Sequence, residues 1–472
     1  MGAKLHVLPN ISKFLGNFFI KNFKNAFIPF IFYIVISFFQ TFFVLLQNRR
    51  INDNINNMVY RITAPTEMKA APSLPASKSI SNRALIIQAL SKENIKISNL
   101  SDCDDTRVMV KALNEKSKTI DIGAAGTAMR FLTAYLAVND GEHILTGTER
   151  MKHRPIAPLV NALRVLGADI DYLGEEGFPP LSIRGHRLSG GHLEIAGGIS
   201  SQYISALLLI APTMEKGLEL RLTGDIVSRP YIDLTLSLMQ DFGIKAEWTS
   251  FDTIVVDPGN YKGRDFSVEN DWSAASYWYE IMSLVNDRNA NLTMDGLTDG
   301  SMQGDSSVRF LFMPLGVRTT FTSHERKPTR VVTLEKEDMP IQHMDYDFTE
   351  IPDLAQTAVV TCAMLGIPFC FKGLTSLRIK ETDRIAALQT ELEKLGYVLR
   401  TEQDGTLVWD GSRSEPTGEP IDTYEDHRMA MAFAPVALIT GNITINNPEV
   451  VSKSYPNYWD ELRTAGFNIE EI

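Results

Sequence analysis

One local pattern recurs along most of this 472-residue chain: a helix with one apolar face, a glycine at its end, and then short strands. Leu159–Gly185 and Leu388–Gly411 both show it in full. The glycines that end such helices are Gly167, Gly243, Gly316, Gly396 and Gly466. They are 70 to 80 residues apart, and a weaker helix end lies near Asn114. The same junction occurs in α/β proteins generally, but this regular period favours a repeat, and we predict six α/β units, three in each of two domains.

Length and charge narrow the class of protein. A chain of 472 residues is too long for one hydrophobic core, so two domains are expected. The net charge of −11 argues against non-specific nucleic-acid binding, which needs positive charge, although small anions can still bind where basic residues gather. Cys103, Cys362 and Cys370 show no paired spacing, which indicates a reducing compartment without disulfides. The absence of CxxC and HExxH patterns argues against a zinc site.

Residues 1–57 differ in composition from the rest of the chain. They hold 11 of the 24 phenylalanines, and Ala26–Leu46 is long and apolar enough to be a transmembrane candidate. Two interpretations remain open: a membrane anchor, or a start assigned too early, with the functional protein beginning at Met58. We favour the second, because Asn48–Asn57 is a low-complexity polar tract and the flanking charges give no clear orientation.

Short segments rich in hydroxyl, basic and small residues recur in the first half. Ser77–Arg83 precedes an apolar helical run, and serines at a helix start beside Lys and Arg form an anion-binding arrangement. Gly123–Arg130 has small residues that let a ligand approach the backbone, without the ending of a P-loop. The others are Met151–Pro155, Ser200–Tyr203 and Ser228–Tyr231. Taken singly, each is explained as well by a helix cap, a packing contact or a surface turn.

Carboxylates and cations stand close together in several segments of the second half. They are Asp353, Lys380–Arg384, Asp426–Arg428 and Ser452–Lys453. A solvated helix start accounts for Lys380–Arg384 alone, and a simple cap accounts for Asp353 alone. The combination is more informative than any member.

In its ordered motifs the chain closely resembles the 5-enolpyruvylshikimate-3-phosphate synthase family. The motifs are KSISNRA, AGTAMR, RPI, SSQ, RPYID, IPD, KETDR, DHRMA and SKSYP, in the family's order and approximate spacing. The resemblance runs from about Met58 to the C-terminus.

This resemblance implies a fold. It predicts two inside-out α/β domains, each of three βαβαββ units, closing over a central cleft. Residues 78–270 would form the domain mainly on the shikimate-phosphate side. Residues 58–77 and 271–472 would form the second domain, which carries the catalytic carboxylates, so the first strand after Met58 joins the C-terminal half.

The resemblance also implies two sets of binding residues. Those for shikimate 3-phosphate are Lys78, Ser79, Arg83, Ser200, Ser201, Ser228, Asp353 and Lys380. Those for phosphoenolpyruvate are Lys78, Gly126, Arg154, Gln202, Arg384, Arg428 and Lys453. Together the substrates carry about five negative charges, which Arg forks on carboxylate and phosphate compensate well. We therefore expect neither a metal nor a cofactor, and we expect the cations of the two halves to repel one another until anions bind.

The implied reaction moves the enolpyruvyl group of phosphoenolpyruvate to the 5-hydroxyl of shikimate 3-phosphate and releases phosphate, in chorismate and aromatic amino acid biosynthesis. Asp353 is expected to take the hydroxyl proton. Glu381 is expected to exchange the methylene proton, with Lys453 assisting. Two positions depart from the family: Ala124 stands where Asn is common and Phe131 where Pro is common. They leave inhibitor sensitivity open.

Two rival functions remain to be weighed. The related transferase acting on UDP-N-acetylglucosamine uses a loop cysteine as an acid, and Cys103 is the one cysteine in the first half. A non-catalytic anion-binding protein would not need Asp353 and Glu381 among its cations. We expect a cytoplasmic monomer whose partners are its two substrates, without nucleic acid, and without a membrane unless residues 1–57 anchor it.

Overall fold

The computed structural model describes residues 58–115, 117–323, 330–339, 341–403 and 405–472. Met58–Ile472 forms one compact unit, and the described residues belong to it. The expectations for residues 1–57 therefore lie outside the described part. Among the described helices, none is both long enough and apolar enough for a bilayer crossing.

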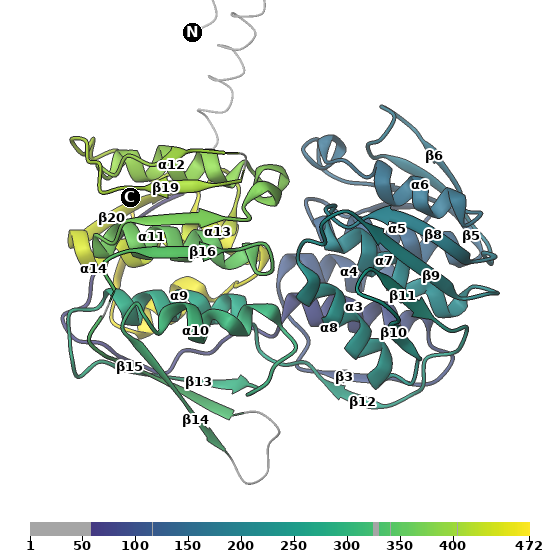
Figure 1. The fold of residues 1–472 in the computed structure, drawn as a ribbon, viewed down its shortest axis with the longest axis horizontal. Coiled ribbons are helices and arrows are strands. Elements are labelled where there is room, and N and C mark those ends of the chain that lie inside the picture. Colours follow the sequence, from purple (N-terminus) through teal and green to yellow (C-terminus); the bar gives the residue numbers. More distant parts are fainter. Residues whose placement is uncertain (1–57, 116, 324–329, 340, 404) are drawn as a thin grey trace, which may run out of the picture. The chain divides into compact units, whose positions relative to one another are not determined.

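Four sheets in the described part share one topology, and strands of all four are labelled in Figure 1. Each has two parallel strands followed by an antiparallel hairpin, and the orders are β4-β5-β7-β6, β8-β9-β11-β10, β2-β13-β15-β14 and β16-β17-β19-β18. Parallel neighbours need a crossover connection, which a helix supplies in three of these sheets. Between β2 and β13 the chain instead passes through the whole first half.

The strands of these sheets are short. In the first half they are β4 (Thr119–Asp121), β5 (Gly141–Thr146), β6 (Asp169–Tyr172), β7 (Leu181–Gly185), β8 (Gly191–Ala196), β9 (Leu218–Thr223), β10 (Ala246–Trp248) and β11 (Thr253–Val256). In the second half they are β2 (Lys69–Ala70), β13 (Asn291–Leu297), β14 (Val317–Ser323), β15 (Arg330–Lys336), β16 (Met344–Asp347), β17 (Phe369–Lys372), β18 (Arg400–Thr401) and β19 (Leu407–Trp409).

Two smaller sheets combine segments that are far apart in the sequence. β3 (Lys96–Ser98) pairs in parallel with β12 (Asp265–Ser267). β1 (Val59–Thr63) lies between β20 (Asn442–Asn446) and β21 (Asn468–Glu471) in an antiparallel sheet. The first strand after Met58 therefore joins the C-terminal half, as expected. These two sheets have two and three strands in the described part, so only four of the six units carry the full strand set.

Helices occupy the interior rather than the outside of each half. Almost every residue of α5 (Gly126–Val138), α9 (Trp272–Leu284) and α11 (Ala355–Leu365) is buried. A helix that is apolar on all sides belongs in a core, and this burial gives the inside-out architecture. The remaining helices are α3 (Lys78–Leu90), α4 (Asp104–Asn114), α6 (Ala157–Val165), α7 (Ser201–Ile210), α8 (Arg229–Asp241), α10 (Val308–Phe312), α12 (Arg384–Lys394), α13 (His427–Phe433), α14 (Ala437–Thr440) and α15 (Tyr458–Thr464).

Buried apolar side chains form two clusters. One runs from Ala76 to Val268. The other joins Ile62, Met68 and Leu74 to residues from Trp272 onward. The chain thus passes from one cluster to the other between residues 74 and 76 and again between 268 and 272.

The glycine at each predicted helix end adopts the left-handed conformation. The φ angles are +103° at Gly167, +81° at Gly243, +82° at Gly316, +86° at Gly396 and +100° at Gly466. The helix of the sixth, weaker predicted unit is α4, which ends at Asn114 as expected. A side chain is disfavoured at such angles, which explains why glycine recurs at these junctions.

Candidate active site

All but one of the predicted site residues line a single pocket. The predicted residues in it are Lys78, Ser79, Arg83, Gly126, Arg154, Ser200, Ser201, Gln202, Ser228, Asp353, Lys380, Glu381, Arg384 and Arg428. The exception, Lys453, lines an adjoining hollow that shares Arg154 and Glu381 with this pocket. Segments up to 376 residues apart in the sequence therefore meet in one place.

Many of these residues lie at the first turn of a helix. The helices α3, α5, α7 and α12 begin at Lys78, Gly126, Ser201 and Arg384. Ser200 caps α7, its hydroxyl accepting from the Gln202 amide at 3.4 Å. Free amides and the helix dipole favour anions at such ends. The helix after Ser77 begins earlier than its apolar run suggested, so Arg83 lies within α3 instead of before it.

Asp353 is held by three cations. Arg428 donates to its Oδ2 at 3.0 Å and Arg384 to its Oδ1 at 3.1 Å. The Lys380 ammonium lies 3.5 Å from Oδ1. Burial alone would raise the pKa of Asp353, but the charges of Arg428, Lys380 and Arg384 hold it well below its usual range. Asp353 is therefore a carboxylate at neutral pH.

Glu381 forms an ion pair with Arg384, a buried residue that contacts several carboxylates. Arg384 donates to Glu381 at 2.9 Å, and its Nε donates to buried Asp426 at 2.6 Å. Burial would raise the pKa of Glu381, whereas Arg384 and Arg154 lower it well below normal. Lys380, Arg384 and Arg428 are thus paired with carboxylates of their own half of the chain. The expectation that the cations of the two halves repel one another until anions bind stays a prediction.

Two cations of the first half are also engaged by the protein. Lys78 lies 3.7 Å from the carboxylate of Asp105. Arg83 is buried and donates to two hydroxyls and two backbone carbonyls. The acceptors are Thr235 Oγ1 at 2.7 Å, Ser205 Oγ at 2.9 Å, Ser79 O at 3.0 Å and Tyr231 O at 3.1 Å. Most of the five N–H groups of Arg83 are therefore used within the fold. The ring of Phe131 lies beneath its guanidinium, with 5.5 Å between them.

Some of the residues expected to bind phosphoenolpyruvate lie near Arg154. Gly126 starts α5 directly against this guanidinium, and Gln202 donates to Thr127 at 3.4 Å. Lys453 donates to the backbone oxygen of Glu425 at 2.7 Å. Ala124 lines the hollow between Arg154, Glu381 and Lys453, so this departure from the family motif removes an amide beside the site.

Several lining residues had no place in the predicted set. They are Asp105, Thr127, Tyr231, Asp271, Ser273, Ala274, Tyr277 and Ser454. Tyr231 and Thr127 stood inside segments already singled out, so their neighbours could have indicated them. Asp105 and Asp271 carried no local signal, because ordinary helix starts also contain aspartate.

His427 is buried at the start of α13, and neither ring nitrogen has a hydrogen-bond partner among the described residues. Burial lowers its pKa well below the usual value, and the charges of Lys78 and Arg428 lower it further. The ring is therefore neutral at physiological pH.

Cys103 does not reach the pocket. Its side chain is fully buried, and its sulfur lies 3.4 Å from the hydroxyl of Thr106. No group of three or more His, Cys, Asp or Glu side chains in the described ranges is arranged to hold a metal ion.

Fold and pocket together define an α/β protein whose pocket brings cations and carboxylates from both halves of the chain together. Residues 62–117 and 111–462 match the family model described as EPSP synthase (3-phosphoshikimate 1-carboxyvinyltransferase). The chain belongs to the EPSP synthase family.

Individual relatives agree with this assignment. A protein of Bacteroides fragilis strain YCH46, named 3-phosphoshikimate 1-carboxyvinyltransferase, is 58% identical over 414 residues, covering 88% of this chain and 99% of its own length. One of the same name from Aliivibrio fischeri strain MJ11 is 39% identical, covering 83% and 95%. Among solved structures, EPSP synthase of Acinetobacter baumannii superposes with a TM-score of 0.70 at 20% identity, covering 88% and 100%. The last similarity supports the fold.

Proposed function

We propose that this enzyme transfers the enolpyruvyl group of phosphoenolpyruvate to the 5-hydroxyl of shikimate 3-phosphate, with release of phosphate. The observation that carries the proposal is the placement of Asp353 and Glu381 in one cationic pocket. A pocket that only trapped anions would gain nothing from two carboxylates, since each repels the ligand. Groups that must move protons beside bound anions need this arrangement.

The lining residues divide into two proposed substrate sites. Shikimate 3-phosphate would contact the serines at the helix starts together with Lys78, Arg83, Lys380 and Asp353. Phosphoenolpyruvate would lie near Gly126 and Gln202, with Lys78, Arg154, Arg384, Arg428 and Lys453 around its carboxylate and phosphate. Arginine forks match these planar or tetrahedral anions better than lysine does, which supports the second assignment.

The chemistry is addition followed by elimination. The substrate hydroxyl loses its proton to Asp353 as its oxygen attacks the enol carbon. The methylene carbon gains a proton from Lys453, or from Glu381 after that carboxylate has taken up a proton. In the elimination a methyl proton returns and the carbon–oxygen bond to phosphate breaks. Arg residues stabilise the charge that develops on the departing phosphate.

A domain division accompanies this proposal. We infer that residues 78–270 form one domain and that residues 58–77 with 271–472 form the other, because the two apolar clusters change over at these points. One chain contributes the whole pocket, which supports a monomer, and free thiols support the cytoplasm.

Acceptor specificity and two carboxylate variants test the proposal. Phosphate release from phosphoenolpyruvate should require shikimate 3-phosphate and should not occur with UDP-N-acetylglucosamine. Asp353→Ala and Glu381→Gln should lower turnover by roughly 10²–10⁴-fold while retaining phosphoenolpyruvate binding. Glu381→Gln should also slow solvent deuterium exchange into the methylene group.

Asp460→Ala and Glu142→Gln are matched controls, because both carboxylates are exposed and paired at the surface. Turnover at the wild-type rate in both site variants would leave a bare anion trap and overturn the proposal.

A further inference from the structure

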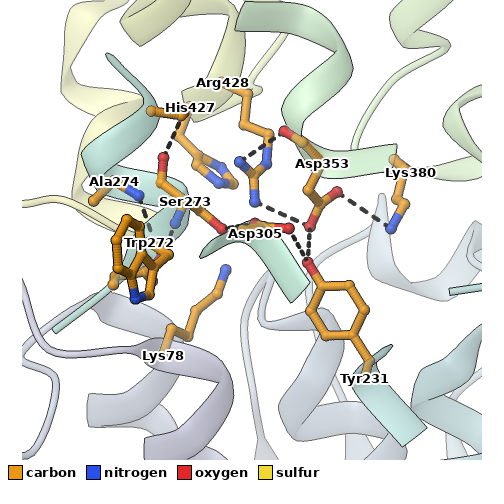
Figure 2. A network of polar contacts seen from close by, with 12 residues as sticks. Lys78, Tyr231, Trp272, Ser273, Ala274, Asp305, Asp353, Lys380, His427 and Arg428 are labelled. Atoms are coloured by element: carbon orange, nitrogen blue, oxygen red, sulfur yellow. Dashed lines mark hydrogen bonds and ion pairs between the residues drawn. The ribbon is translucent and has the colours of Figure 1, made fainter. Parts of the chain in front are cut away.

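Asp305 is a buried carboxyl that the proposed chemistry does not yet use. It lies in the short turn Gly304–Ser307, and its exposed fraction is 3%. Its Oδ1 accepts from the hydroxyl of Tyr231 at 3.1 Å, and its Oδ2 accepts from Ser273. The Tyr231 hydroxyl also lies 3.4 Å from Oδ2 of Asp353 (Figure 2). One phenol thus stands between two carboxyl groups.

The single hydroxyl proton of Tyr231 gives this arrangement two hydrogen-bonding states. A phenol has one proton and can donate to only one of the two carboxylates. When both are ionised, the shorter contact favours donation to Asp305, and Asp353 then faces a lone pair of the phenol oxygen. If a proton arrives on Asp353, it can donate to that lone pair, and the phenol proton can move on to Asp305.

The two carboxyl groups differ in proton affinity in the direction that such a transfer needs. The cations around Asp353 hold its pKa well below its usual range, despite burial. Burial and the charge of Asp353 raise the pKa of Asp305 to about 6, although Arg428 opposes this. A proton taken by Asp353 is therefore more stable on Asp305.

In the described part of the chain, no cation forms an ion pair with Asp305. Asp271 at the start of α9 adds further negative charge, and Arg428 on α13 is bound to Asp353. On the adjoining α10, Arg309 pairs with Asp299 at 2.6 Å. Among the described residues, Asp305 accepts hydrogen bonds from the hydroxyls of Tyr231 and Ser273 and from neither arginine.

We propose that Tyr231 and Asp305 form a relay that removes the substrate hydroxyl proton from Asp353. The proposal rests on the function proposed above, in which Asp353 takes that proton. The substrate O–H bond breaks and Asp353 Oδ2–H forms. That bond then breaks as a new Tyr231 O–H forms, while the original phenol proton passes to Asp305 Oδ1. No electron pair leaves the relay, Asp305 ends neutral, and Asp353 is again a carboxylate. Tyr231 and Asp305 are positioning residues here, because they act through Asp353.

Two variants test the relay. Asp305→Asn keeps the shape but removes the acceptor, and Tyr231→Phe keeps the ring but removes the hydroxyl. Each should lower kcat by about 10²-fold, the lower end for a positioned proton acceptor, with the KM of either substrate changed less than about threefold. The double variant should be no slower than the slower single one, since both interrupt one path. Asp345→Asn and Tyr346→Phe, on β16 and outside the pocket, are the matched controls.

The pH dependence supplies a readout that a structural role would not move. Below about pH 6 Asp305 becomes protonated in the wild type and can no longer accept, so kcat should fall as the pH is lowered. In Asp305→Asn this acid-side fall should be absent. Additive losses in the double variant, or an unchanged acid limb in Asp305→Asn, would overturn the relay.

Failure of the relay is distinguishable from failure of the proposed function. If Asp353→Ala loses turnover while Asp305→Asn and Tyr231→Phe keep wild-type kcat, only the relay is wrong. If Asp353→Ala itself keeps wild-type turnover, the assignment of Asp353 as the base is wrong and the relay falls with it.

Discussion

The guanidinium of Arg154 occupies the space that a side chain at Gly126 would need. A Cβ atom added at residue 126 would lie 2.6 Å from Nη1 and 3.1 Å from Cζ of Arg154. Gly126 has no left-handed φ angle, so close approach, rather than backbone conformation, is what requires glycine here. This contact joins the motif Gly123–Arg130 to Arg154, which lies 28 residues after Gly126. Substitutions of Gly126 and Arg154 can therefore be tested together.

Arg154→Ala should raise the KM for phosphoenolpyruvate far more than that for shikimate 3-phosphate. A lost hydrogen bond to a charged group is worth about 1.5–3 kcal/mol, which corresponds to roughly 10- to 100-fold. Steady-state kinetics with each substrate varied in turn provides the measurement. Arg288→Ala removes the same charge from an exposed pair with Asp338 and should change neither constant. Equal effects on both substrates would place Arg154 elsewhere in the mechanism.

Gly126→Ala should raise the KM for phosphoenolpyruvate in the same direction, because the new methyl group must displace the Arg154 guanidinium. The displaced atoms end a flexible side chain, so the fold should survive with an unchanged midpoint of thermal unfolding. Combining it with Arg154→Ala should add little, since both act on one contact. Gly174→Ala is the control, with the nearest atom at 3.7 Å. Fully additive effects would contradict the steric explanation.

A chain that begins at Met58 should fold and keep full activity. The described residues form one compact unit from Met58, and β1 is paired on both sides by β20 and β21. Circular dichroism, thermal unfolding and turnover should match those of the 472-residue chain. A loss of folding or activity in the shorter chain would show that residues 1–57 contribute to the enzyme.

The Glu280→Gln variant should become more stable relative to the wild type as the pH rises. Glu280 is fully buried in α9, and burial raises its pKa well above the usual value. A raised folded-state pKa stabilises the fold at low pH, and this contribution is lost as the pH rises from about 4.3, the unfolded value, through the folded value. The wild type should therefore lose up to about 1.4 kcal/mol of unfolding free energy per pH unit relative to the variant.

Urea unfolding of both proteins at a series of pH values from 5 to 8 measures this difference. Glu142→Gln, at an exposed position, should show no such trend. A constant difference between wild type and Glu280→Gln across the series would mean that Glu280 is ionised in the fold.

Local chemistry made much of the fold predictable. A helix that must stop and turn into a strand needs a residue that tolerates a positive φ angle, so Gly167 and Gly396 marked their junctions in the sequence. The apolar runs after Ser77–Arg83 and after Ser200–Tyr203 indicated two helices, and Ser200 was visible as a cap. The earlier start of α3 was missed, because the polar residues of its first turns do not show an apolar helical pattern.

By itself, the sequence determined the repeat, the family motifs and the residue types of the pocket, since these depend on order along the chain. Tertiary structure alone decided which charges meet. It pairs Lys78 with Asp105 and Arg384 with Asp426, and it places Asp305 beside Tyr231 and Asp353. These partners are separated by 27 to 122 residues. Electrostatic interaction depends on distance and burial, which no local pattern encodes, so proton affinities and the relay became visible only in the folded chain.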